Sequence, residues 1–88
     1  MLPEVRAVLI EKTKEKIKDW GLNWKTIQKV DIKELYKCPV GWRTLHKLVN
    51  NEKYSTYLSV QVNLLKYYNV MYSENYGIVQ LLKLESDA

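Results

Sequence analysis

The first twenty residues place apolar side chains at helical spacing, between two residues that suit the ends of a helix. Pro3 fits a first turn, where its missing N–H has no partner in any helix. Gly21 is a natural stop, because glycine accepts the left-handed backbone in which many helices end. From Glu4 onward, lysines lie mostly opposite one broad apolar face. That face consists of Val5, Val8, Leu9, Ile17 and Trp20. Residues 1–21 are therefore predicted to form an N-terminal helix.

The next segments are divided by residues that begin or end helices. Asn23 is a suitable N-cap for a segment with apolar residues three apart, at Trp24, Ile27 and Val30. Asp31 can cap a short helix over Ile32–Cys38, and Pro39 ends it, because proline cannot continue the backbone hydrogen-bond ladder. The residues that this short helix turns inward are Ile32, Leu35 and Tyr36. Trp20 and Trp24 are expected to form core with Leu35 and Leu45.

A tight turn at Val40-Gly41 leads into a predicted helix over Trp42–Asn50, with Leu45, Leu48 and Val49 as its apolar residues. After a polar break, Ser55 or Thr56 is expected to cap a helix within residues 55–70. Its apolar stripe is Leu58, Val62, Leu65 and Tyr68. The tail Met71–Leu84 fits either a fifth helix or two strands around Ser73–Gly77. The fold predicted is mainly α, a compact bundle of four to five short helices.

The 88 residues are 47% hydrophobic and 27% charged, which suits one small folded domain. One cysteine cannot form an internal disulfide, and no apolar run approaches the ~20 residues that span a bilayer. These features favour a cytoplasmic protein. Cys38 and His46 are too few for a zinc site, and no glycine-rich phosphate loop is present. The sequence therefore predicts no metal, no cofactor and no enzymatic activity, with a Cys38–His46 nucleophile pair as a remote alternative.

Charge is concentrated in the middle of the chain. Residues 11–53 hold eleven Lys and Arg against six Asp and Glu, whereas residues 54–88 hold two against three. A local basic surplus is typical of proteins that bind polyanions. It is also typical of solvated helix surfaces, so it indicates a nucleic-acid ligand without establishing one.

Two short helices on either side of Pro39-Val40-Gly41, followed by a third amphipathic helix, have the layout of a helix-turn-helix. Here the residues resemble the lambda-repressor/Cro-like family. Val40–Leu48 resembles that family's turn and recognition helix, with Thr44-Leu45 as its common Thr-aliphatic pair. Val49-Asn50-Asn51 resembles its usual helix ending. The resemblance implies a helix-turn-helix over residues 31–50. Pro39, Gly41 and Tyr36 depart from the family pattern.

A second register resembles a winged helix-turn-helix. In it Trp42–Asn50 is the supporting helix, Thr56–Tyr68 is the recognition helix, and Val70–Leu84 forms a β-hairpin wing. The residues that would then read bases are Tyr57, Gln61, Asn63 and Lys66.

In the preferred register, the first turns of Trp42–Asn50 enter the major groove of DNA. Arg43 can grip a phosphate or contact guanine, and Thr44 can meet a phosphate or a thymine methyl. Lys33 and Lys37, on the supporting helix, would cross phosphates. The full set of expected DNA-binding residues is Lys33, Lys37, Trp42, Arg43, Thr44, His46, Lys47, Asn50, Asn51 and Lys53.

The C-terminal segment, residues 71–88, is near-neutral and rich in tyrosine and leucine, which suits either self-association or closure of a small core. The expected dimerisation residues are Tyr72, Tyr76, Ile78, Leu81, Leu82 and Leu84. The sequence thus favours a DNA-binding protein, a homodimeric transcriptional regulator or repressor of prokaryotic, phage or archaeal-virus origin. The alternative is a helix-turn-helix-shaped module that binds a protein, such as a small phage-encoded inhibitor of a host protein.

Overall fold

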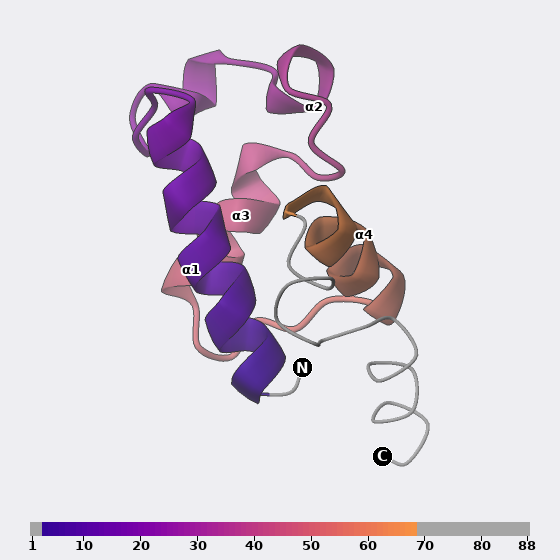
Figure 1. The fold of residues 1–88 in the computed structure, drawn as a ribbon. Coiled ribbons are helices and arrows are strands. Elements are labelled where there is room, and N and C mark those ends of the chain that lie inside the picture. Colours follow the sequence, from indigo (N-terminus) through magenta and orange to yellow (C-terminus); the bar gives the residue numbers. More distant parts are fainter. Residues whose placement is uncertain (1–2, 69–88) are drawn as a thin grey trace.

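The computed structural model describes residues 3–68 (Figure 1). This part of the chain is helical and contains no strand. Its elements are α1 (Pro3–Asp19), the 3-10 turn η1 (Ile27–Lys29), α2 (Ile32–Leu35), α3 (Trp42–Asn50) and α4 (Leu58–Tyr68). The predicted mainly α class is confirmed. The helix-or-hairpin alternative for Met71–Leu84 and the expected dimerisation residues lie outside the described residues.

Helix α1 ends where the sequence predicts, and the hydrogen bonds around Gly21 explain why. Gly21 has a φ of 71° and donates its N–H to the Lys18 carbonyl at 2.9 Å. The N–H of Leu22 reaches back to the Ile17 carbonyl at 3.0 Å. This pair of bonds is a Schellman motif, which satisfies two of the carbonyls that a helix end leaves without partners. Leu22 and Ile17 both belong to the apolar cluster, so the motif also turns the chain toward the core.

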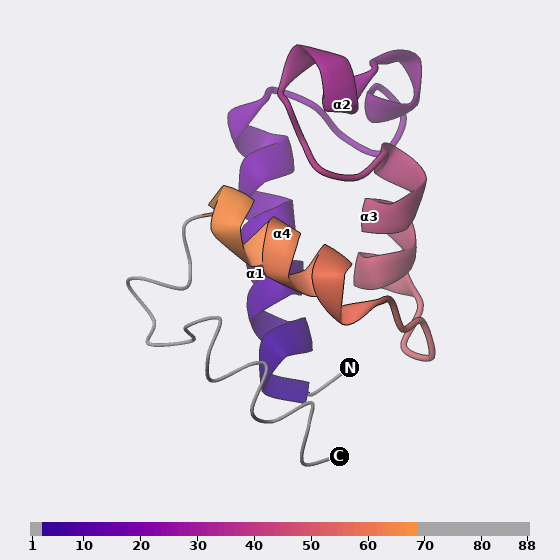
Figure 2. The ribbon, with the colours of Figure 1, turned by 90° about the vertical axis from the view of Figure 1, so that its right-hand side faces the viewer.

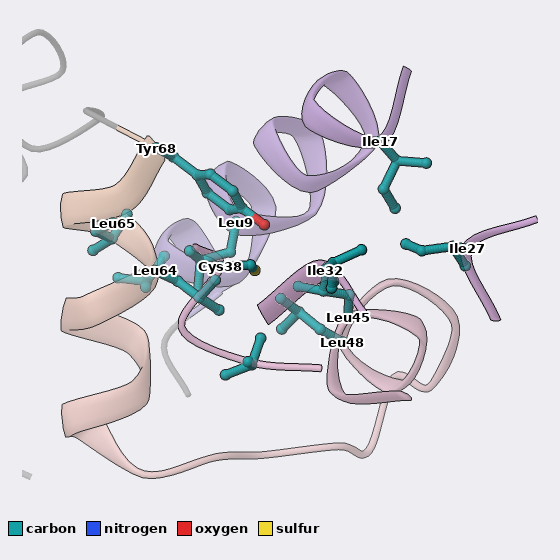
Figure 3. Close-up of a cluster of buried hydrophobic side chains, with 12 residues drawn as sticks. Leu9, Ile17, Ile27, Ile32, Cys38, Leu45, Leu48, Leu64, Leu65 and Tyr68 are labelled. Carbon is teal, nitrogen blue, oxygen red and sulfur yellow. The ribbon is translucent and has the colours of Figure 1, made fainter. Parts of the chain in front are cut away.

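The long helix α1 packs against both α3 and α4 (Figures 1 and 2). The core fills the space between them and is closed at one end by η1 and α2 (Figure 3). Its buried apolar residues are Val5, Leu9, Ile17, Ile27, Ile32, Cys38, Val40, Leu45, Leu48, Leu64, Leu65 and Tyr68. One polar pair is buried among them: the hydroxyl groups of Thr13 and Tyr68 form a hydrogen bond of 3.0 Å. The pair links α1 to α4.

Helix α2 is shorter than predicted. Asp31 caps it as expected, accepting a hydrogen bond from the Glu34 N–H, but the helix ends at Leu35 and not at Cys38. Lys37 has a left-handed φ of 57°, which no α-helix accommodates. The expectation that Leu35 points inward is also wrong, because its side chain is 62% exposed.

Tyr36 shows why the helix stops. Its ring stacks on that of Trp20, with centres 4.6 Å apart and planes within 6°. Its carbonyl accepts a hydrogen bond of 2.6 Å from the Tyr67 hydroxyl. These tertiary contacts hold Tyr36 at the C-cap of α2. Residues 36–41 then form a six-residue connection to α3, longer than the three or four residues of a typical helix-turn-helix turn.

Helix α4 differs from its prediction in start and in buried face. It begins at Leu58, with Tyr57 supplying the first accepting carbonyl, which is one or two residues later than a cap at Ser55 or Thr56 implies. Its buried face is Gln61, Leu64, Leu65 and Tyr68, whereas Leu58 and Val62 are half-buried. Gln61 can occupy a buried position because its Nε2 donates to the Thr56 carbonyl at 3.0 Å.

Candidate nucleic-acid interface

Helix α3 has the predicted bounds and two contrasting faces. Leu45 and Leu48 are buried in the core. The opposite face carries side chains at helical spacings of three and four residues, which therefore lie along one side. They are Arg43, His46, Lys47 and Asn50, and all four are exposed. The helix contains no acidic residue.

The end of α3 is fixed by a side chain from α1. The guanidinium of Arg6 donates to the carbonyls of Leu48 and Tyr54 at 2.8 Å each, and also to that of Asn51. The Leu48 carbonyl belongs to the last turn of α3, where no intrahelical donor is available. A cation at this position also interacts favourably with the negative end of the helix dipole. This role of Arg6 is not predictable from the local sequence, because the accepting carbonyls lie 42 to 48 residues away.

Two tryptophans order the exposed side chains of α3. The Arg43 guanidinium lies over the Trp42 ring, 5.6 Å from its centre. The His46 ring meets Trp24 edge to face, with centres 5.0 Å apart, and Trp42 in the same manner at 6.3 Å. Cation–π and edge-to-face contacts of this kind are attractive. They restrict the directions in which Arg43 and His46 can point.

The expected packing of Trp20 and Trp24 with Leu45 and Leu35 is confirmed only for the core that contains Leu45. Both tryptophans are half-buried and pack on the edge of the core, while Leu35 is exposed. Trp20 is covered by Tyr36, and Trp24 borders α3 through His46. Trp42 is half-buried, so it packs against the core and still contributes to the surface.

A shallow depression lies on this surface, lined by Gln28, Trp42, Arg43, His46 and Lys47. Four of these five residues belong to the predicted recognition helix. Gln28 comes from η1 and was not predicted, because the sequence pattern around it indicates only an apolar segment with Ile27 inward. Its Nε2 donates to the Trp24 carbonyl at 2.7 Å. Trp24 in turn contacts His46, so η1 and α3 form one continuous surface.

The remaining predicted DNA-binding residues differ in their exposure and in their position relative to α3. Thr44 is half-buried, and Lys33 and Lys53 are exposed. The expectation that Lys37 lies on the supporting helix is wrong, because Lys37 follows α2 in the connection. Asn51 is engaged in the turn after α3, where its Oδ1 accepts from the Lys53 N–H at 3.0 Å.

Both asparagines among the expected DNA-binding residues, Asn50 and Asn51, have side chains held by hydrogen bonds. The Nδ2 of Asn50 donates to the His46 carbonyl at 3.1 Å, one turn earlier on the same helix. This bond keeps the Asn50 side chain close to the surface of α3, beside the basic residues.

The structure disfavours α4 as a recognition helix. Gln61 is only 4% exposed and its amide is bonded to Thr56, so the prediction that it reads a base is wrong. Asn63 and Lys66 are exposed, and Tyr57, just before the helix, is 81% exposed. Most of the remaining α4 side chains are at least half-buried. Such a helix packs into the fold along most of its surface.

Neither a metal centre nor an accessible thiol forms within residues 3–68. No group of three His, Cys, Asp or Glu residues is placed there to hold a metal ion. Cys38 is 3% exposed, and burial raises the pKa of its thiol, against weaker opposing effects of a hydrogen bond at Val40 and the charge of Lys33. A nucleophile needs the thiolate, so this cysteine is suited to packing. None of the described helices combines the length and apolarity needed to cross a membrane.

No protein-family model, curated protein or solved structure matches this chain.

Proposed function

We propose that this protein binds double-stranded DNA in a sequence-specific manner, with the exposed face of α3 in the major groove. The observation that carries the proposal is the stripe of Arg43, His46, Lys47 and Asn50 on one face of a nine-residue helix. These are the side-chain types that contact phosphates and base edges. The buried residues of the opposite face anchor the helix, so that docking requires little rearrangement.

The charge around α3 supports a polyanionic ligand. Residues 23–53 hold seven Lys and Arg against three Asp and Glu. Lys33, Lys37 and Lys53, all exposed, extend the basic character to both sides of the helix. Phosphate neutralisation by such residues supplies the sequence-independent part of DNA affinity.

Three residues of the stripe, Arg43, Lys47 and Asn50, have definite roles in this proposal, as does the neighbouring Thr44. Arg43 contacts guanine O6 and N7, or a phosphate, with its guanidinium kept in place by Trp42. Lys47 and Asn50 contact the backbone further along the groove, and Thr44 meets a phosphate or a thymine methyl at the edge of the helix. No metal or cofactor takes part.

The biological assignment extends this proposal. A small DNA-binding domain gains affinity when two copies bind half-sites about one helical turn apart. We therefore propose a homodimeric transcriptional regulator that acts in the cytoplasm of a prokaryote, or on a phage or archaeal-virus genome. The expected dimerisation residues between Tyr72 and Leu84 lie outside the described residues.

Fluorescence anisotropy with random and AT-rich duplexes, across a salt series, tests the proposal. We expect the logarithm of affinity to fall linearly with the logarithm of salt concentration, and the double variant Arg43→Ala/Lys47→Ala to lower both affinity and slope. The matched control is Lys14→Ala/Lys18→Ala, which removes the same charge from exposed positions of α1. This control should retain most of the binding.

The outcomes separate the assignments. Equal losses in the two double variants would show that net charge matters and the α3 surface does not. An effect of Lys66→Ala in place of the α3 variant would favour the winged register. Absence of binding at ~50 mM salt, where phosphate contacts are strong, would overturn DNA binding.

One observation favours a second candidate function, a protein-interaction module. Leu35 is 62% exposed and borders a depression formed with Val30, Asp31, Glu34 and Lys37. A leucine surrounded by charged residues of both signs suits a small protein contact. Against this candidate, only Tyr57 among the described tyrosines is highly exposed, so no broad tyrosine surface forms there. A Leu35→Glu variant that binds DNA normally but loses a captured protein partner would support it.

A further inference from the structure

Gln28 lines two surface depressions, and Trp42 lines both of them as well. One is the depression that Gln28 shares with the basic face of α3. The other is lined by Gln28, Lys29, Val30, Asp31, Ile32, Gly41 and Trp42. Gln28 and Trp42 are common to both. A ligand that lies along the exposed face of α3 therefore meets Gln28 beside the first turn of the helix.

The backbone around Gln28 is fixed by its neighbours, and the Gln28 side chain is held by one hydrogen bond. Ile27, its neighbour in η1, has no exposed surface, so it fixes the turn in the core. Before it, the Oδ1 of Asn23 accepts from the N–H groups of Lys25 and Thr26 at 2.9 and 3.0 Å. The Gln28 amide itself donates to the Trp24 carbonyl at 2.7 Å. This bond restricts the rotation of the side chain, so Gln28 loses less entropy when a ligand binds than an unbonded glutamine would.

The amide keeps the groups needed to read a base. A glutamine amide has two N–H donors and one carbonyl oxygen, and only one donor is used by Trp24. The second N–H and Oε1 remain for a ligand. Glutamine contacts adenine in this bidentate way, accepting from N6 and donating to N7 in the major groove. The partly apolar Trp42 ring next to it suits the methyl group of the paired thymine.

We propose that Gln28 determines specificity for an A·T base pair, next to the base pairs that α3 contacts. The inference rests on the proposed function and adds a residue from outside the predicted helix-turn-helix. Arg43, which contacts guanine or phosphate, lines the same depression. The two side chains would read neighbouring positions of one site.

Selection of bound duplexes from a random pool tests this proposal, with the position-by-position base preference as the readout. The variants are Gln28→Ala and Gln28→Glu, and the matched control is Asn63→Ala, an exposed amide on α4. We expect one position at which the unmodified protein prefers adenine about tenfold, the discrimination that one good bidentate pair provides. Gln28→Ala should abolish that preference and lower the affinity for the preferred duplex about tenfold, the same discrimination. Gln28→Glu should shift it toward cytosine, whose N4 donates to a carboxylate.

The results separate failure of this inference from failure of DNA binding itself. If Gln28→Ala leaves the base preferences unchanged while Arg43→Ala alters them, the role of Gln28 is refuted and the α3 interface stands. If Gln28→Ala weakens binding to every sequence equally, Gln28 supports the surface and reads no base. If the unmodified protein binds no duplex, both proposals fail. Unfolding midpoints from circular dichroism check that each variant is folded, and an exposed substitution at Gln28 should leave the midpoint nearly unchanged.

Discussion

Replacing Arg6 by methionine removes the guanidinium that joins α1 to the last turn of α3, while it keeps most of the side-chain length. Two of the three bonds lost, to Leu48 and Tyr54, are partly buried and measure 2.8 Å. A hydrogen bond to a charged group contributes about 1.5–3 kcal/mol, but such contributions do not add fully when the accepting carbonyls regain water. We expect Arg6→Met to lower the free energy of unfolding by about 2–3 kcal/mol. For a domain of this size, that corresponds to about 10–20 °C in the unfolding midpoint.

Urea unfolding, followed by tryptophan fluorescence and far-ultraviolet circular dichroism, measures this loss. Lys14→Met is the matched control, because it removes the same charge from an exposed position of α1 and should cost under about 0.5 kcal/mol. Arg6→Lys should fall between the two, since an ammonium keeps the charge but lacks the planar fork. Amide exchange in the last turn of α3 should accelerate in Arg6→Met. Equal stability of Arg6→Met and Lys14→Met would refute the reasoning.

Two further predictions concern the buried Thr13–Tyr68 pair. Thr13→Val and Tyr68→Phe should each cost about 1–2 kcal/mol, because each leaves a buried hydroxyl without its partner, and the double variant should cost less than the sum. Additive losses in a four-protein urea-unfolding cycle would contradict this coupling. Burial raises the pKa of the Tyr68 hydroxyl above its ordinary value of 10, outweighing the opposing Thr13 hydrogen bond. The folded state therefore favours the neutral phenol, and its contribution to stability is complete below pH 10 and declines as the pH rises further. The free energy of unfolding should fall less steeply above pH 10 in Tyr68→Phe than in the unmodified protein, and equal slopes would count against the assignment.

Helix ends that depend on neighbouring residues were predictable from sequence. Gly21 terminates α1, which ends at Asp19, because the left-handed backbone of Gly21 permits the Schellman bonds. Helix α3 follows the turn that contains Pro39 and Gly41, and its bounds match the prediction at both ends. In each case the signal and its effect lie within a few residues.

Features that depend on distant partners were not predictable. Tyr36 leaves α2 to stack on Trp20, an interaction over 16 residues of sequence that overrides the local helical pattern. Gln61 is buried because a backbone carbonyl satisfies its amide, which a hydrophobicity pattern cannot reveal. The roles of Arg6 and Gln28 have no sequence signature, since their partners are backbone carbonyl groups, which every residue carries. The exposed stripe of α3 could be predicted from the three- and four-residue spacing of its side chains. That η1 extends this surface could be seen only in the folded structure.

The bonds that close the core also set an order of events during protein synthesis. Thr13 meets its partner 55 residues later in the chain, and Arg6 meets its carbonyls 42 to 48 residues later. At about 5–20 residues per second, a ribosome needs roughly 3–11 s to make the intervening chain. Helix α3 is made before that interval ends, but the apolar face of α1 lacks all of α4 until its last part. The dense charge on the rest of α1 keeps this nascent segment hydrated until Tyr68 has been made.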